Sequence, residues 1–230
     1  MKRVIKIVAV VVGVLVIAFG AFSIYVYVSG GSAEPTREVA AERIQPVEPH
    51  SVVFQAVPGE SEARFIIDEV LRGLDTTVVG VTDQLDGSVA VGFEPPGVEI
   101  GQFEINLRAI QTDDEMRDRT IRSMILETNR DEFEFSSFRP TAVRGVPESI
   151  AVGSRLELEV TGDLTIRDVT REVPFTMVLD IVSEEEIRGV AQTQVLYRDF
   201  GIEVPYVGGG SIVEAVADTV RLELEFVARP

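Results

Sequence analysis

Residue types that carry out nucleophilic, Schiff-base or acid–base chemistry are scarce in this chain, apart from carboxylates. Cysteine is absent, the only histidine, His50, lies between Pro49 and Ser51, and both lysines, Lys2 and Lys6, lie at the extreme N-terminus. A Ser-His-Asp site needs a histidine held in place by other groups. Schiff-base chemistry and P-loop phosphate binding need a lysine. We therefore expect His50 to be an ordinary solvated residue and the chain not to be an enzyme.

Carboxylates are abundant, with 38 Asp and Glu residues. They fall mainly on the polar faces of predicted strands or in short runs, 113–115 and 184–186, and such runs are typical of solvated faces and helix starts. A glycosidase-type pair of acids stays open as an alternative. The spacing of a calcium loop and the ligands of zinc or haem are missing. We predict no metal and no cofactor.

The acids and bases are unevenly divided along the chain. Every Asp and Glu lies beyond residue 30, whereas Lys2, Arg3 and Lys6 precede it. Residues 31–230 therefore combine 18 arginines with 38 acids, a formal charge of −20. Because phosphate would be repelled by such a domain, we do not expect it to bind nucleic acid.

The N-terminus is predicted to anchor the chain in a membrane. After a basic stretch at 1–6, residues 7–28 form 22 consecutive uncharged, mostly apolar positions. At 1.5 Å per residue, this helix would span roughly 33 Å, enough for the hydrocarbon core. The positive-inside rule places residues 1–6 in the cytoplasm and the rest outside. We therefore predict a single-pass protein of the cell membrane with an extracytoplasmic C-terminal domain; cleavage of a signal peptide near Gly31–Ala33 is the alternative.

Residues 29–47 are small, polar and charged, with Pro35 and Pro46, and are interpreted as a linker. A flexible chain of this length has a root-mean-square reach of about 25 Å. The domain at 48–230 would thus be held close to the membrane surface.

Strand patterns dominate this domain. Apolar and polar residues alternate with the period of a half-buried strand over 51–57, 63–70, 85–93, 102–107, 133–138, 155–164, 171–182, 187–196 and 220–228. One segment, Thr112–Asn129, has helical spacing, with Thr112 as the expected N-cap. The fold class is therefore all-β, an antiparallel barrel of about eight strands with one lateral helix. An immunoglobulin-like sandwich is the alternative, which the length of the strands disfavours.

The apolar positions of these strands are expected to face the barrel interior. They are Phe65, Ile67, Phe103, Ile105, Leu107, Phe135, Leu158, Val160, Phe175, Met177, Leu179, Leu222, Leu224 and Phe226. An eight-stranded barrel is either filled by such side chains or holds one small ligand. Periodicity alone leaves a packed core and a hollow one both open.

The most distinctive segment is a predicted hairpin, GDLTIRDVTREVPFTMVLD at Gly162–Asp180. It resembles the central hairpin of the YceI-like family, with its G-x-L-T-I-[basic]-x-V-T-[basic] run. Further similarities to that family are the helix and strand of Arg117–Phe138, the shortened R-x-D-F-G-I element at Arg198–Ile202, and Phe65, Gly80 and Gly87. The resemblance covers roughly residues 50–230.

This resemblance implies an extended, lipocalin-like barrel that binds a polyisoprenoid or another long-chain lipid in its apolar interior, without catalysis. The fourteen inward positions then become candidate lipid contacts. Many family members carry a histidine where this chain has Glu69, so we considered Arg117, Asp118, Arg167 and Arg198 as headgroup contacts. Two other functions stay open: a solidly packed structural or envelope-stress interaction domain, and a carboxylate-dependent hydrolase. Pairing of the domain into a homodimer is also left open.

Overall fold

The computed structural model describes residues 33–46, 50–205, 207 and 212–230, with six isolated helical positions between 14 and 24. The predicted transmembrane segment at 7–28 therefore lies almost entirely outside the described residues. Among the helices of the described part, none is both long and apolar enough to cross a bilayer.

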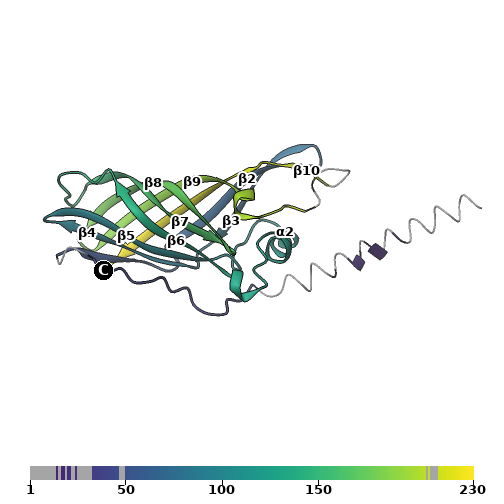
Figure 1. The fold of residues 1–230 in the computed structure, drawn as a ribbon, viewed down its shortest axis with the longest axis horizontal. Helices are drawn as coiled ribbons and strands as arrows, with labels where there is room; N and C mark the ends of the chain where they lie inside the picture. The colour runs from purple at the N-terminus through teal and green to yellow at the C-terminus, as the bar shows by residue number, and fades with distance from the viewer. Residues whose placement is uncertain are drawn as a thin grey trace, which may run out of the picture.

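The domain is a closed antiparallel β-barrel (Figure 1). Its strands are β1 (Val52–Ala56), β2 (Glu62–Leu71), β3 (Leu74–Thr82), β4 (Leu85–Phe93), β5 (Pro96–Asn106), β6 (Phe135–Arg144), β7 (Arg155–Ile166), β8 (Val169–Ser183), β9 (Glu186–Leu196), β10 (Val213–Val216) and β11 (Thr219–Arg229). Eight of them close the ring in the order β1-β4-β5-β6-β7-β8-β9-β11, and β11 pairs back onto β1. Outside this ring of eight, β2 pairs with β11 and also with β3, with which it forms a hairpin. The short β10 pairs with the C-terminal part of β2. The predicted barrel is thus confirmed, and the sandwich is not formed.

The barrel has two distinct ends. At one end, hereafter the helix end, lie the β2–β3 turn, α2 (Glu115–Thr120) and the β7–β8 turn. Ion pairs join Arg117 of α2 to Glu69 of β2, and Arg167 of the β7–β8 turn to Glu127, which follows the helical segment. At the opposite end, hereafter the far end, lie the β4–β5 and β8–β9 turns and the C-terminus. This polarity decides where the interior is filled and where it is hollow.

The predicted helix at 112–129 is shorter than expected. Asp114, not Thr112, caps α2, because its side chain accepts a hydrogen bond from Arg117 N at 2.8 Å. The Thr112 hydroxyl instead donates to buried Asp118 at 2.6 Å. After Thr120 the chain continues as a π-helix, Ile121–Ile125, and then leaves the helical path. The helical spacing is confirmed, but the helical path covers only Glu115–Ile125, about three turns.

Three glycines are covered by aromatic rings of the neighbouring strand. Gly80 pairs with Phe65, Gly87 with Phe103, and Gly189 with Phe226 in the strand registers. A β-carbon at any of the three would come within 2.1–2.2 Å of a ring carbon. The rings therefore lie flat across the wall where only glycine leaves room, a device that helps sheets to curve.

Gly189→Ala is expected to destabilise the protein, because the Phe226 ring that it would meet is fully buried and has no space to move into. Overpacking of this kind costs about 1–3 kcal/mol. Urea unfolding should show a lower midpoint than for the wild type. Gly97→Ala is the matched control, since nothing lies within 4 Å of its β-carbon position. Equal midpoints for both variants would contradict the packing described.

Residues 33–46 are not a free coil, contrary to the interpretation of 29–47 as a flexible linker. This segment, hereafter the strap, lies along the outer wall of the barrel. Thr36 donates to Glu134 through its backbone N (2.9 Å) and hydroxyl (2.6 Å). The Arg37 guanidinium donates twice to Glu104, at 2.8 Å each, and the Ala40 N donates to the same carboxylate at 3.0 Å. Two buried carboxylates, Glu104 and Glu134, thus hold the strap in place.

An arginine cluster stabilises the far end. Arg229 donates to both carboxylate oxygens of Glu60 at 2.8 Å and contacts Glu186 at 3.0 Å. These hydrogen bonds lower the pKa of the Glu60 carboxyl, and those from Arg188 and then Arg229 lower the pKa of Glu186, from the ordinary value of 4.5. A carboxyl with a lowered pKa stabilises the folded state above its unfolded pKa, and that stability is lost as the pH falls through the folded pKa.

Arg229→Met should therefore make the unfolding temperature less dependent on pH under acidic conditions. For the wild type we expect the unfolding temperature to fall as the pH drops below about 4.5, the region where these carboxyls take up protons. In the variant this part of the decline should be smaller. Thermal unfolding followed by circular dichroism across that range measures the difference, and parallel profiles would show that the cluster makes no net contribution.

Candidate functional site

The interior of the barrel holds a cavity of about 250 Å³ at the helix end. Of the fourteen predicted inward residues, ten line it: Phe65, Ile67, Phe103, Ile105, Leu107, Val160, Phe175, Met177, Leu222 and Leu224. Period-two alternation places them there, because every second side chain of a strand faces the same side of the wall. The wall is almost entirely apolar.

The prediction for Phe135 is wrong. Its ring faces outward, where the Arg37 guanidinium of the strap lies 3.8 Å from the ring centroid. The inward positions of β6 are instead Ser136 and Phe138, which line the cavity. The strand expected at 133–138 in fact begins at Phe135, because Phe133 belongs to a 3-10 turn before it. A turn does not preserve the two-residue period, so the inward phase was shifted by one residue.

Leu158, Leu179 and Phe226 face inward and are buried, but they lie in the packed half of the barrel and do not line the cavity. Phe226 contacts Phe103 with ring centroids 5.4 Å apart. Since Phe103 lines the cavity and Phe226 does not, this aromatic pair forms the floor between the two halves. The barrel is therefore hollow at the helix end and filled at the far end.

At the helix end, much of the cavity wall comes from loops and helical turns, which strand patterns do not predict. The side chains that line the cavity from these segments are Ile110, Ile121, Ile125, Leu126, Tyr197, Phe200, Ile202 and Val204. Two signals in the sequence pointed to them. The helical spacing of Ile121 and Ile125 marked an apolar face, and the family-like element at 198–202 contains Phe200 and Ile202.

Two charged side chains meet at the cavity. Glu69 is inward-facing on β2, in phase with Phe65 and Ile67, and Arg117 approaches it from α2 with a nitrogen 3.6 Å from Oε1. Both residues line the cavity, and their side chains are 11% and 22% exposed. Glu69 Oε1 is buried and accepts no hydrogen bond from any residue that the structure describes. Glu69 and Arg117 thus place a charged pair in the otherwise mostly apolar wall of the cavity.

The comparisons with known proteins agree with this architecture. The sequence model of the YceI-like domain matches residues 54–228. The chain belongs to the YceI-like family. No match is found among curated proteins.

Solved structures share the fold of this YceI-like protein at low sequence identity. Burkholderia cenocepacia BcnA is 15% identical, with a TM-score of 0.58, over 75% of this chain and 98% of its own. A polyisoprenoid binding domain from Saccharophagus degradans, implicated in plant cell wall breakdown, is 15% identical, with a TM-score of 0.57, over 76% and 97%. Campylobacter jejuni YCEI protein is 13% identical, with a TM-score of 0.52, over 66% and 84%. At these identities the similarity establishes the barrel alone.

The other three polar residues considered for this YceI-like domain lie away from the cavity. Asp118 is buried and accepts hydrogen bonds from the backbone N and hydroxyl of Thr112, at 2.8 and 2.6 Å. Arg167, in the β7–β8 turn, pairs with Glu127 at 2.7 Å. Arg198 is exposed and pairs with Asp218 at 3.1 Å. Of the four polar residues considered, only Arg117 therefore lines the cavity.

The structure offers little for metal or acid-pair chemistry in the YceI-like barrel. Within the described ranges, no group of three or more His, Cys, Asp or Glu residues could hold a metal ion. Glu223 also borders the cavity, but its neighbours Leu222 and Leu224 occupy the inward positions of β11 and Glu223 pairs with Arg221 at 3.0 Å outside. A glycosidase needs two carboxylates facing one substrate. Glu69 has no such partner among the described lining residues.

Proposed function

We propose that this YceI-like protein binds a polyisoprenoid or another long-chain lipid in its barrel, outside the cytoplasm and anchored to the membrane. The observation that carries the proposal is the apolar cavity of about 250 Å³ with the Glu69–Arg117 pair in its wall. The structural neighbour from Saccharophagus degradans, described as a polyisoprenoid binding domain, supports it. A solidly packed interaction domain would have no reason to leave this half empty.

The cavity is large enough for an apolar guest. An engineered cavity of about 150 Å³ binds benzene, and this one measures about 250 Å³. By simple scaling from six carbons, it has room for about ten carbon atoms. A prenyl chain of that length would fit entirely inside, whereas a longer chain would insert one end and leave the remaining carbons outside. Each buried CH₂ contributes about 0.8 kcal/mol relative to water.

The polar pair favours an alcohol as the headgroup. The Glu69 side chain, 11% exposed, carries a carboxylate acceptor and Arg117 is a donor beside it, so a hydroxyl could donate to the first and accept from the second. A phosphate would also attract Arg117, but it would be repelled by the Glu69 carboxylate. The chemistry of the site thus fits a neutral prenyl or other long-chain alcohol.

Glu69→Leu is expected to weaken binding of a ten-carbon prenyl alcohol by about tenfold or more, since a hydrogen bond to a charged group contributes about 1.5–3 kcal/mol. The methyl ether of the same chain cannot donate to Glu69 and is the matched control ligand. Its affinity should be the same for wild type and variant. Equal losses for alcohol and ether would mean that Glu69 shapes the cavity instead of binding the headgroup.

The membrane part of the proposal rests on the sequence. Residues 7–28 are apolar along a length that fits a bilayer, and the three basic residues of the N-terminus precede them. By the positive-inside rule, the barrel would then lie on the extracytoplasmic side. Reporter fusions to each end of the full chain test this: activity of an alkaline phosphatase fused after Pro230 is expected, and its absence would reverse the orientation.

The binding proposal is tested by titrating a fluorescent prenyl alcohol into the full chain in detergent. Saturable binding of one molecule per chain, displaced by an unlabelled ten-carbon alcohol, is the expected result. A linear signal equal to that of empty micelles would favour the packed interaction domain instead.

A further inference from the structure

The strap has a direction that matters for the cavity. It begins at the helix end, where Thr36 binds Glu134, and the backbone O of Glu134 accepts a hydrogen bond at 2.8 Å from Leu107, a cavity-lining residue. It then runs towards the far end, where Ile44 Cβ lies 3.4 Å from the β-carbon position of Gly101. Figure 1 shows this course along the lower side of the barrel. The chain before the strap therefore joins the barrel at the cavity end.

Chain length then limits how far the apolar run at 7–28 can lie from the cavity. Only four residues, or five Cα–Cα steps, separate Val28 from Ala33. Even fully extended, they reach about 18 Å. A strap bound at several points cannot swing away, unlike a flexible linker with a reach of about 25 Å. If residues 7–28 lie in a membrane, the helix end must be the end nearest to it.

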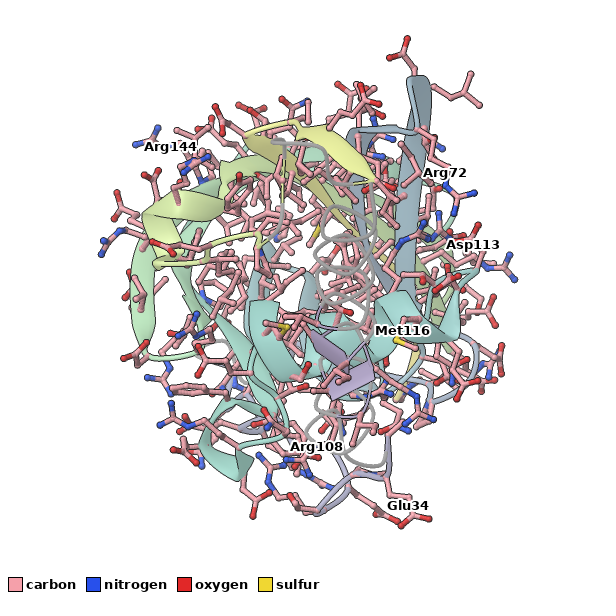
Figure 2. All side chains as sticks on the ribbon, turned by 90° about the vertical axis from the view of Figure 1, so that its right-hand side faces the viewer. Glu34, Arg72, Arg108, Asp113, Met116 and Arg144 are labelled. Atoms are coloured by element: carbon pink, nitrogen blue, oxygen red, sulfur yellow. The ribbon has the colours of Figure 1, made fainter. Side chains whose placement is uncertain are left out.

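The same end carries exposed apolar side chains from three separate elements. Leu74 at the β2–β3 turn is 69% exposed, Ile212 before β10 is 60% exposed, and Met116 on α2 is 49% exposed. The turn and the β10 segment are joined, because Arg72 N donates to Ile212 O at 2.9 Å. Figure 2 looks onto this end and shows Arg72 and Met116 on the same side of the barrel.

The charged residues near these apolar side chains indicate which kind of bilayer this end would contact. Asp113, just before α2, and Glu115, its first residue, are both exposed. The whole domain is also strongly acidic. An anionic bilayer would be repelled, whereas a zwitterionic one would accept the apolar tips and Arg72 at its headgroups.

We propose that the helix end of the barrel docks onto a zwitterionic bilayer, with the β2–β3 turn and Ile212 at the level of the headgroups, so that the cavity exchanges lipid directly with the membrane. This inference rests on the proposed function and adds its source of ligand. Direct exchange matters because a chain longer than about ten carbons would otherwise expose its remainder to water, at about 0.8 kcal/mol per CH₂. The strap supplies the orientation, and the anchor supplies a high effective concentration.

The absence of cysteine makes the test clean, because single cysteines can be labelled without background. Leu74→Cys and Val152→Cys, the latter in the exposed turn at the far end, are labelled with an environment-sensitive fluorophore in the full chain in phosphatidylcholine nanodiscs. Spin-labelled lipids should quench most of the fluorescence at position 74 and leave position 152 unchanged. Replacing part of the phosphatidylcholine by phosphatidylglycerol should reduce the quenching at 74. Absent quenching at 74, or equal quenching at both positions, would overturn the docking.

Arg37→Ala combined with Thr36→Val tests the strap. Neither side chain lines the cavity, so the affinity of the folded protein for a ten-carbon alcohol in detergent should stay unchanged. The unfolding midpoint is expected to fall, because buried Glu134 and Glu104 lose hydrogen bonds. Quenching at position 74 should fall towards that at 152, and undiminished quenching would refute orientation by the strap. Alcohol binding without quenching would leave the proposed function standing and refute the docking. Quenching without alcohol binding would refute the proposed function alone.

Discussion

Ala191→Phe should abolish binding of a ten-carbon prenyl alcohol while leaving the barrel folded. Ala191 is buried on β9 opposite Met177, and both line the cavity. The new ring has the size of benzene and would occupy about 150 Å³, more than half of the space available. The alcohol would lose burial of about six carbons, about 5 kcal/mol, which corresponds to more than a thousandfold in affinity. Titration with the fluorescent alcohol measures this loss.

Ala228→Phe is the matched control in the packed half. Ala228 is equally small and buried and faces the interior from β11, but it is not among the residues that line the cavity. There the ring would overpack the core and destabilise the fold by about 1–3 kcal/mol. We therefore expect Ala191→Phe to remove binding without a loss of stability, and Ala228→Phe to lower stability without filling the cavity. Equal destabilisation by both variants would contradict a barrel that is hollow at one end only.

Affinity should rise with chain length and then level off. Prenyl alcohols of one and two isoprene units differ by five carbons, about 4 kcal/mol or roughly a thousandfold, if both chains are buried completely. Three and four units should add little, because the cavity of about 250 Å³ is already full at about ten carbons and Phe226 blocks the way onward. Partitioning into micelles without protein must be measured and subtracted. A continued rise at the same slope would mean that the packed half opens for longer chains.

The sequence predicts the barrel well because most strands keep one face in the interior. The hairpin expected at 155–164 and 171–182 is present as β7 and β8, and the alternation of Val160, Met177 and Leu224 gives their orientation correctly. The sequence pattern does not predict β3. Its inward face, on the same side of the sheet as Phe65 of β2, carries Thr76, Gly80 and Thr82. Small and polar residues hide the period there, and the role of Gly80 depends on a ring from another strand.

The division into hollow and packed halves could not be read from the pattern. Leu158 and Val160 are two residues apart on the same face, yet only Val160 lines the cavity. What distinguishes them is the register of the neighbouring strands and the position of the Phe103–Phe226 pair. The binding of Arg37 by Glu104 was equally hidden, because it joins residues 67 positions apart. Such contacts depend on the closed ring, not on local periodicity.

The most direct test of lipid binding is mass spectrometry of the lipid that co-purifies with the full chain. Wild type and Ala191→Phe are produced and purified side by side, and their bound lipids are extracted and quantified per chain. We predict a prenyl or other long-chain alcohol that is bound in about equimolar amount to the wild type and is lost from Ala191→Phe. An empty wild-type barrel, or the same lipid at the same level in the variant, would contradict the account.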